Sequence, residues 1–171
     1  MNRPRRGDLA KHWILDPETC FLNHGSFGAT PVSVLEEQSR LRKLIESDPV
    51  RFFERDYIPL MKGAVGKLSE FINANPEGLV FVKNTTEGVN TVLRSLDLKP
   101  GDEIIVTNHS YQACWNAVDF VTERSDAKTV VVDIPFRVKN EEEVVDLIMD
   151  KVTGKTVLAM IDTVTSATGL R

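Results

Sequence analysis

Residues 103–111 read Glu-Ile-Ile-Val-Thr-Asn-His-Ser-Tyr, a short apolar run that passes directly into polar side chains. The continuous Ile-Ile-Val run is typical of a strand that is buried on both faces of a sheet. The sequence that follows predicts a helix at 111–123. A buried strand, a polar loop and a helix together form the repeating unit of a parallel α/β fold.

The same alternation continues on both sides of this stretch. Apolar runs predict further strands at 79–82, 129–133 and 156–161. Helical spacing predicts helices at 84–96 and 141–152, and two leading helices at 31–48 and from about 59 to 72. The predicted fold class is therefore α/β, with a mainly parallel sheet and helices on both faces. Residues 162–171 leave no room for a crossover helix, so we expect a sheet that is cut short.

Composition excludes several classes of protein. The chain has 171 residues, 42% of them hydrophobic, with 21 Lys+Arg against 25 Asp+Glu and a formal net charge of −4. Such a chain is typical of one globular domain, and its mild acidity argues against nucleic-acid binding. The apolar runs are too short for a membrane span. Neither of the two cysteines belongs to a Cys-x-x-Cys pair, so we expect no zinc site and a reducing, cytoplasmic location.

Polar side chains follow three of the predicted strands, at 84–86, 108–111 and 162–169. Ligands of open parallel sheets bind outside the carboxyl ends of the strands. These three stretches are therefore the candidate site.

The stretch Asn84-Thr85-Thr86-Glu87-Gly88 opens a helix directly after a predicted strand. Free N–H groups and the helix dipole at such a position favour a phosphate or a carboxylate, and two threonines add hydroxyl donors. The alternative is that Asn84 or Thr85 only caps the helix. The chain contains neither a P-loop nor Gly-x-Gly-x-x-Gly, which argues against a nucleotide-binding protein.

Four other residues each have a chemical and a structural interpretation. His109 could stack on a flat cofactor ring or shuttle protons, or it could be a loop histidine held by hydrogen bonds. His24 lies in a glycine-rich turn, where a ligand contact and a turn-stabilising bond are both open. Cys114 is expected to be a buried, inert thiol rather than a nucleophile. Asp162 could bind a metal or act as a base, or it could cap the next element.

Three phrases, taken together and in this order, resemble the class V aminotransferase family of pyridoxal-phosphate enzymes, in its isopenicillin N epimerase-like and cysteine desulfurase-like branch. They are Phe-Leu-Asn-His-Gly-Ser-Phe-Gly-Ala-Thr-Pro at 21–31, Asn-Thr-Thr-Glu-Gly-Val-Asn at 84–90 and Thr-Ser-Ala-Thr-Gly at 165–169. The resemblance implies a fold type I, aspartate aminotransferase-like large domain, truncated. Residues 1–30 would form an N-terminal arm with a substrate-side turn, and residues 31–171 a partial domain that binds the cofactor.

The resemblance also implies pyridoxal 5′-phosphate as the cofactor and a role for each matching residue. Thr85 and Thr86 would bind its phosphate, and Asn84 would orient that turn. His109, or alternatively Tyr111, would stack on the pyridine ring. The remaining implied contacts are Ser166 near the phenolic oxygen of the cofactor, and Asn23 and His24 near an amino-acid substrate.

Family members run to about twice this length or more. The lysine that forms the Schiff base and the aspartate that pairs with the pyridine nitrogen lie further along in the family, as does the C-terminal small domain. No catalytic residue and no metal ligand is assigned here. We expect the N-terminal fragment of an enzyme with epimerase, aminotransferase or C–S lyase chemistry, inactive alone and homodimeric when complete. The alternative is a non-catalytic module that pairs with a full-length homologue.

Overall fold

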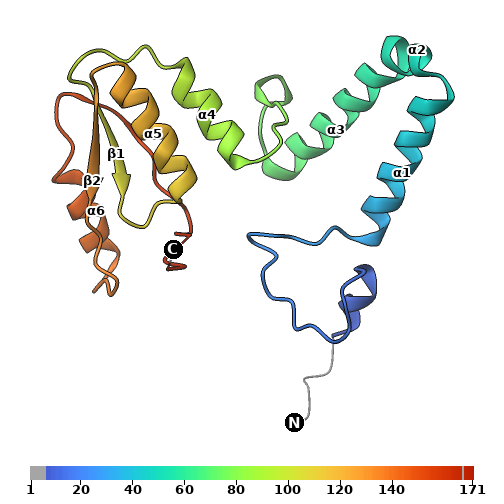
Figure 1. Ribbon diagram of the computed structural model, residues 1–171, viewed down its shortest axis with the longest axis horizontal. Coiled ribbons are helices and arrows are strands. Elements are labelled where there is room, and N and C mark those ends of the chain that lie inside the picture. Colours follow the sequence, from blue (N-terminus) through green and yellow to red (C-terminus); the bar gives the residue numbers. More distant parts are fainter. Residues whose placement is uncertain (1–6, 167) are drawn as a thin grey trace. The chain divides into compact units, whose positions relative to one another are not determined.

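The computed structural model describes residues 7–166 and 168–171 (Figure 1). The chain forms two compact units, Met1–Val80 and Phe81–Arg171, and each is described by itself. The first six residues of the predicted N-terminal arm, and residue 167 of the third phrase, lie outside the described residues. No helix in the described part of the chain is long and apolar enough to cross a membrane.

The first unit is helical. Its elements are a 3₁₀ turn at Asp8–His12, α1 (Val32–Ser47), α2 (Pro49–Arg51), a π-helical stretch at Phe52–Asp56, α3 (Tyr57–Ile72) and a 3₁₀ turn at Pro76–Gly78. Pro49 ends α1, as the sequence predicts, but it also opens the next helix at the first helical position. The Asp48 carboxylate accepts the N–H of Arg51 at 3.0 Å and caps that helix.

The second unit contains a three-stranded parallel sheet. Its strands are β1 (Glu103–Thr107), β2 (Lys128–Val132) and β3 (Thr156–Ala159), in the order β2-β1-β3. Its helices are α4 (Thr85–Ser95), α5 (Gln112–Arg124) and α6 (Glu141–Met149). Three of the four predicted strands are therefore confirmed.

The fourth predicted strand, at 79–82, is wrong. The segment belongs to no strand, and Val80 is 82% exposed. Both edges of β1 are already paired, one with β2 and the other with β3. An apolar run becomes a strand only where another strand offers backbone partners, and no described residue offers them here.

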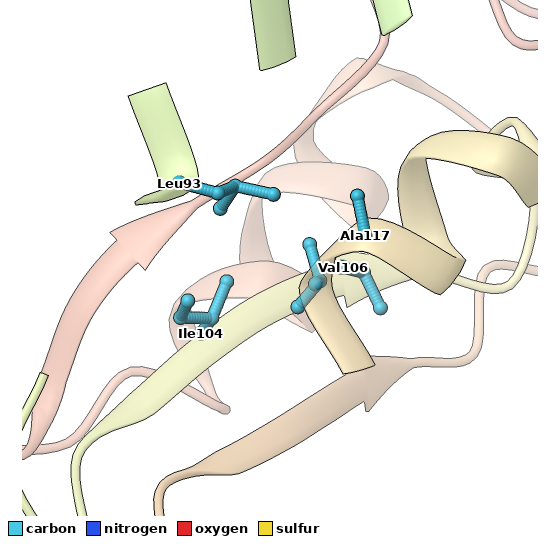
Figure 2. Close-up of a cluster of buried hydrophobic side chains, with 5 residues drawn as sticks. Leu93, Ile104, Val106 and Ala117 are labelled. Carbon is cyan, nitrogen blue, oxygen red and sulfur yellow. The ribbon is translucent and has the colours of Figure 1, made fainter. Parts of the chain in front are cut away.

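Helices cover both faces of the sheet. Successive side chains of β1 point to opposite faces, and since they are apolar on both, each face packs against helices. Ile104 and Val106 pack with Leu93 of α4 and with Ala117 of α5. Figure 2 shows these four side chains gathered on one side of the strand. Ile105 lies on the other face, where the apolar side of α6 covers it. The predicted α/β arrangement is confirmed.

Because the three strands are parallel, their carboxyl ends lie at one edge of the sheet. Residues 108–111 leave this edge from β1 and residues 160–170 from β3. Two of the three candidate stretches therefore meet there.

Candidate functional site

The first turn of α4 is closed by a reciprocal cap. Oδ1 of Asn84 accepts the N–H of Glu87 at 2.9 Å, and Oε2 of Glu87 accepts the N–H of Lys83 at 2.7 Å. The interpretation of Asn84 as a helix cap is thus confirmed. Its predicted role at the cofactor stays a prediction.

The first turn of α6 has the same cap. Oδ1 of Asn140 accepts the N–H of Glu143 at 3.0 Å, and Oε2 of Glu143 accepts the N–H of Lys139 at 2.7 Å. The backbone bond from Lys139 is the main cause that lowers the pKa of Glu143, and the Lys139 side chain adds to it. Since α6 carries no candidate residue, the Lys-Asn-x-x-Glu pattern marks a helix start and not by itself a ligand site.

What distinguishes α4 is the pair of threonines inside its cap. Among residues 7–166 and 168–171, no acceptor pairs with the N–H groups of Thr85 and Thr86 or with the hydroxyl of Thr85. Thr85 is exposed and Thr86 half-buried. The positive end of the helix dipole lies at the same place. These donors fit an anion such as a phosphate.

The side chain of Thr86 lies beside the thiol of Cys114 on α5. Cys114 is 4% exposed, and burial raises its pKa. The Thr86 bond opposes that rise, and the negative charge of Asp162 adds to it. The thiol is therefore neutral and sheltered, which agrees with the inert interpretation and argues against a nucleophile.

Asp162 caps α5. Its Oδ2 accepts the N–H of Tyr111 at 3.2 Å, across 51 positions of sequence. The expectation that Asp162 caps the next element is wrong, because its carboxylate bonds to a residue earlier in the chain. In the described part of the chain, no group of three or more His, Cys, Asp or Glu residues could hold a metal ion.

His109 is buried in the β1–α5 loop, as is its neighbour Ser110. It is 7% exposed, and its Nδ1 lies 2.8 Å from Oγ1 of Thr168. The interpretation as a loop histidine held by a hydrogen bond is thus confirmed. Tyr111, the alternative ring stacker, is 49% exposed. The choice between the two stays a prediction.

The loop after β3 is a tight turn closed by Thr165. The N–H of Thr165 donates to the carbonyl of Leu170 at 2.9 Å, and the N–H of Gly169 donates to the carbonyl of Thr165 at 2.9 Å. Gly169 has φ +67°, a conformation that side chains rarely adopt. Ser166 is exposed on this turn, so its side chain is accessible to a ligand.

Asn108 is a positioning residue that the sequence did not single out within its stretch. Its side chain accepts the N–H of Ile134 at 2.9 Å, and it donates to the carbonyl of Ile134 at 3.1 Å and to the carboxylate of Asp133. These bonds tie the start of the His109 loop to the end of β2. A polar side chain directly after a buried strand is the only sequence signal for this role.

Asn23 and His24 belong to the first unit. Both are exposed. The His24 ring packs edge-on against Phe21, with ring centroids 4.8 Å apart, and also contacts Trp13 at 5.9 Å. A side chain at Gly28 would come within 2.8 Å of the His24 carbonyl, so the turn requires glycine there. The predicted substrate contact of Asn23 and His24 stays a prediction.

Comparison with known proteins gives a consistent result. The family model "Aminotransferase class-V" matches residues 37–171. Hercynylcysteine sulfoxide lyase of Schizosaccharomyces pombe is 30% identical over 128 residues, which are 74% of this chain and 32% of that protein. Isopenicillin N epimerase of Amycolatopsis lactamdurans is 34% identical over 109 residues, 61% of this chain and 27% of that protein. The chain spans about a third of the length of these relatives.

Solved structures show the same fold. The cystine C–S lyase C-DES, in complex with cysteine persulfide, superposes with a TM-score of 0.76 at 22% identity, covering 83% of this chain and 38% of that one. The cysteine desulfurase CsdA of Escherichia coli gives 0.61 at 24% identity, covering 77% and 34%. A C-DES variant holds glycine covalently linked to its PLP cofactor. The predicted fold type I architecture and the family's cofactor, pyridoxal 5′-phosphate, are confirmed, and the chain belongs to the class V aminotransferase family.

Proposed function

We propose that this chain forms the phosphate-binding and ring-binding part of a pyridoxal-phosphate enzyme. The carrying observation is the pair of threonines at the start of α4, where two N–H groups without an acceptor among the described residues lie beside an exposed hydroxyl, that of Thr85. The buried Thr86–Cys114 contact and the charge of Asp162 link this turn to the edge of the sheet where β1 and β3 end. The residues present therefore fit the cofactor of the family.

Each candidate residue then has one task. The N–H groups of Thr85 and Thr86 and the Thr85 hydroxyl hold the phosphate, while Asn84 keeps their turn in place. The imidazole of His109 covers one face of the ring, with Tyr111 as the alternative. The other proposed contacts are Ser166 at the phenolic oxygen, and Asn23 and His24 at the substrate.

The bound cofactor would supply an electron sink for bonds at the α-carbon of an amino acid. We therefore infer an amino-acid substrate and epimerase, aminotransferase or C–S lyase chemistry. The relatives include a sulfoxide lyase, an L-cysteine desulfhydrase and an isopenicillin N epimerase, which represent C–S lyase and epimerase chemistry, whereas aminotransferase chemistry is supported by the family model alone. We also infer that the lysine and aspartate of the family lie outside these 171 residues, so that this chain alone does not turn over substrate. A cytoplasmic location and a homodimer of the complete enzyme are part of the same proposal.

Binding experiments on the 171-residue chain test the phosphate site. The Kd of pyridoxal 5′-phosphate should be lower than that of pyridoxal, which lacks the phosphate. Thr85→Val removes one hydroxyl donor to a charged group, worth about 1.5–3 kcal/mol, so Kd should rise at least tenfold. Thr91→Val is the matched control, because the Thr91 hydroxyl donates to the Glu87 carbonyl at 2.8 Å, within the helix.

Equal Kd values for the two forms of the cofactor, or an equal effect of both threonine variants, would contradict the phosphate site. Borohydride reduction followed by intact mass tests the lysine inference. A stoichiometric adduct at one lysine of this chain would show that it carries its own reactive amine.

The interaction module remains a second candidate, favoured by the sheet itself. Among the described residues β2 and β3 each have a single neighbouring strand. Val131 on β2 is 38% exposed and Val157 on β3 is 50% exposed. Such edges can pair with another chain. Size-exclusion chromatography with a full-length homologue should yield a stable mixed complex if this candidate is right, and only separate or aggregated species if it is wrong.

A further inference from the structure

His109 is held by a hydroxyl group from a different loop. Its Nδ1 lies 2.8 Å from Oγ1 of Thr168, which is 59 positions away. The two residues meet because β1 and β3 are neighbours in the sheet and each residue follows one of these strands. His109 is 7% exposed, so this bond forms in a largely dry environment where hydrogen bonds are stronger.

The direction of this bond follows from Thr165. The N–H of Leu170 donates to Oγ1 of Thr165 at 2.8 Å. The Thr165 hydroxyl can donate to Oγ1 of Thr168 at 2.7 Å or to the Leu170 carbonyl at 3.3 Å. That carbonyl already accepts the N–H of Thr165 at 2.9 Å. The Leu170 carbonyl keeps a second lone pair, but the contact from Thr165 to Thr168 is much the shorter of the two, which favours Thr165 as the donor to Thr168.

With Thr165 as its donor, the Thr168 hydroxyl has one acceptor left, the Nδ1 of His109. A nitrogen that accepts a hydrogen bond carries no proton, so the proton of the neutral ring lies on Nε2. Each donor in this series polarises the next, which strengthens the final bond to the ring.

We propose that Thr168 is a positioning residue that fixes the imidazole of His109 in one plane and in the Nε2–H tautomer, through a chain of hydrogen bonds that starts at the Leu170 N–H. The role of this chain in cofactor binding rests on the proposed function. A ring with one plane and one tautomer presents a constant face to the pyridine ring. The tautomer itself does not depend on the cofactor.

Nitrogen-15 NMR of the labelled 171-residue chain, without cofactor, tests the tautomer. The spectra are recorded at about pH 8.5, some two units above the ordinary histidine pKa. His12→Gln and His24→Gln variants identify the His109 signals among the three histidines. His109 should show the Nε2–H pattern. An Nδ1–H pattern would overturn the proposal.

Variants at Thr168 test the positioning role. Thr168→Val should give averaged nitrogen shifts, because the ring then exchanges between tautomers, whereas Thr168→Ser should retain the Nε2–H pattern. Thr163→Val, at an exposed threonine of the same segment, is the matched control and should change nothing. Thr168→Ala replaces Thr168→Val if the extra methyl group prevents folding. An Nε2–H pattern that survives loss of the hydroxyl would overturn the proposal.

Cofactor binding separates this proposal from the proposed function. Thr168→Val should raise the Kd of pyridoxal and of pyridoxal 5′-phosphate by the same factor, about two- to tenfold, as expected for one neutral hydrogen bond. Inorganic phosphate should bind as in the parent chain. A parent chain that shows the Nε2–H tautomer but binds no cofactor would contradict the proposed function and leave the tautomer assignment standing. Unequal factors for pyridoxal and its phosphate would overturn the positioning role.

Discussion

Two helices of the second unit, α4 and α6, begin with the same asparagine cap. Comparing variants of the two caps therefore separates the structural role of Asn84 from its role in binding. Asn84→Ala and Asn140→Ala each remove one acceptor, at 2.9 Å from the Glu87 nitrogen and 3.0 Å from the Glu143 nitrogen. Loss of such a cap costs about 1 kcal/mol. The two variants should therefore lose similar stability, with a Tm lower by roughly 4–8 °C for a cooperative unit of this size.

The same two variants should differ in cofactor binding. Asn84 holds the turn that carries the N–H groups of Thr85 and Thr86, whereas α6 has no candidate ligand contact. In Asn84→Ala, phosphate binding must first restore the frayed turn. A cost of about 1 kcal/mol raises the Kd of pyridoxal 5′-phosphate roughly fivefold. Asn140→Ala should leave Kd unchanged.

Urea denaturation followed by circular dichroism gives the stabilities, and titration calorimetry below both transitions gives the Kd values. The parent chain and Asn140→Ala serve as the two references. An equal rise in Kd for both variants would refute the binding role of α4. Unchanged stability in both would refute the cap assignment itself.

Three further predictions follow from burial and charge. Leu93 is 2% exposed in the core shown in Figure 2, so Leu93→Ala should lower the free energy of unfolding by about 2–5 kcal/mol, measured by urea titration; a loss below about 1 kcal/mol would contradict this packing. Cys20 is exposed and Cys114 buried with a raised pKa, so a thiol reagent near neutral pH should modify Cys20 promptly and Cys114 only after unfolding; equal rates would contradict the sheltered thiol. The pKa of Glu143 is lowered on folding, so its charge stabilises the fold above the unfolded pKa and this contribution is lost as pH falls through the folded pKa. Glu143→Gln should therefore flatten the acid limb of a Tm-against-pH curve, and an unchanged limb would contradict the assignment.

Local patterns predicted most of the second unit. The Ile-Ile-Val run of β1 is buried on both faces in the structure, as such a run predicts. Asn84 begins a helix as predicted, because a cap is a property of a few adjacent residues. Pro49 marks a helix boundary for the same local reason.

Contacts between distant residues could not be predicted from the sequence. The bonds from Asn108 to Ile134, from Asp162 to Tyr111 and from Thr168 to His109 join residues 26 to 59 positions apart. They depend on which strands become neighbours, and that is decided by the packing of the whole sheet. The wrong strand at 79–82 has the same origin, because its apolar residues say nothing about a pairing partner.

The most direct test of the central claim is to observe the α4 N–H groups while the cofactor binds. In proton–nitrogen correlation spectra, addition of pyridoxal 5′-phosphate or inorganic phosphate should move the signals of Thr85 and Thr86 more than any others in α4 and α6. Pyridoxal should leave these two signals in place. Unchanged Thr85 and Thr86 signals at saturating cofactor would contradict the claim that this chain holds the phosphate at the start of α4.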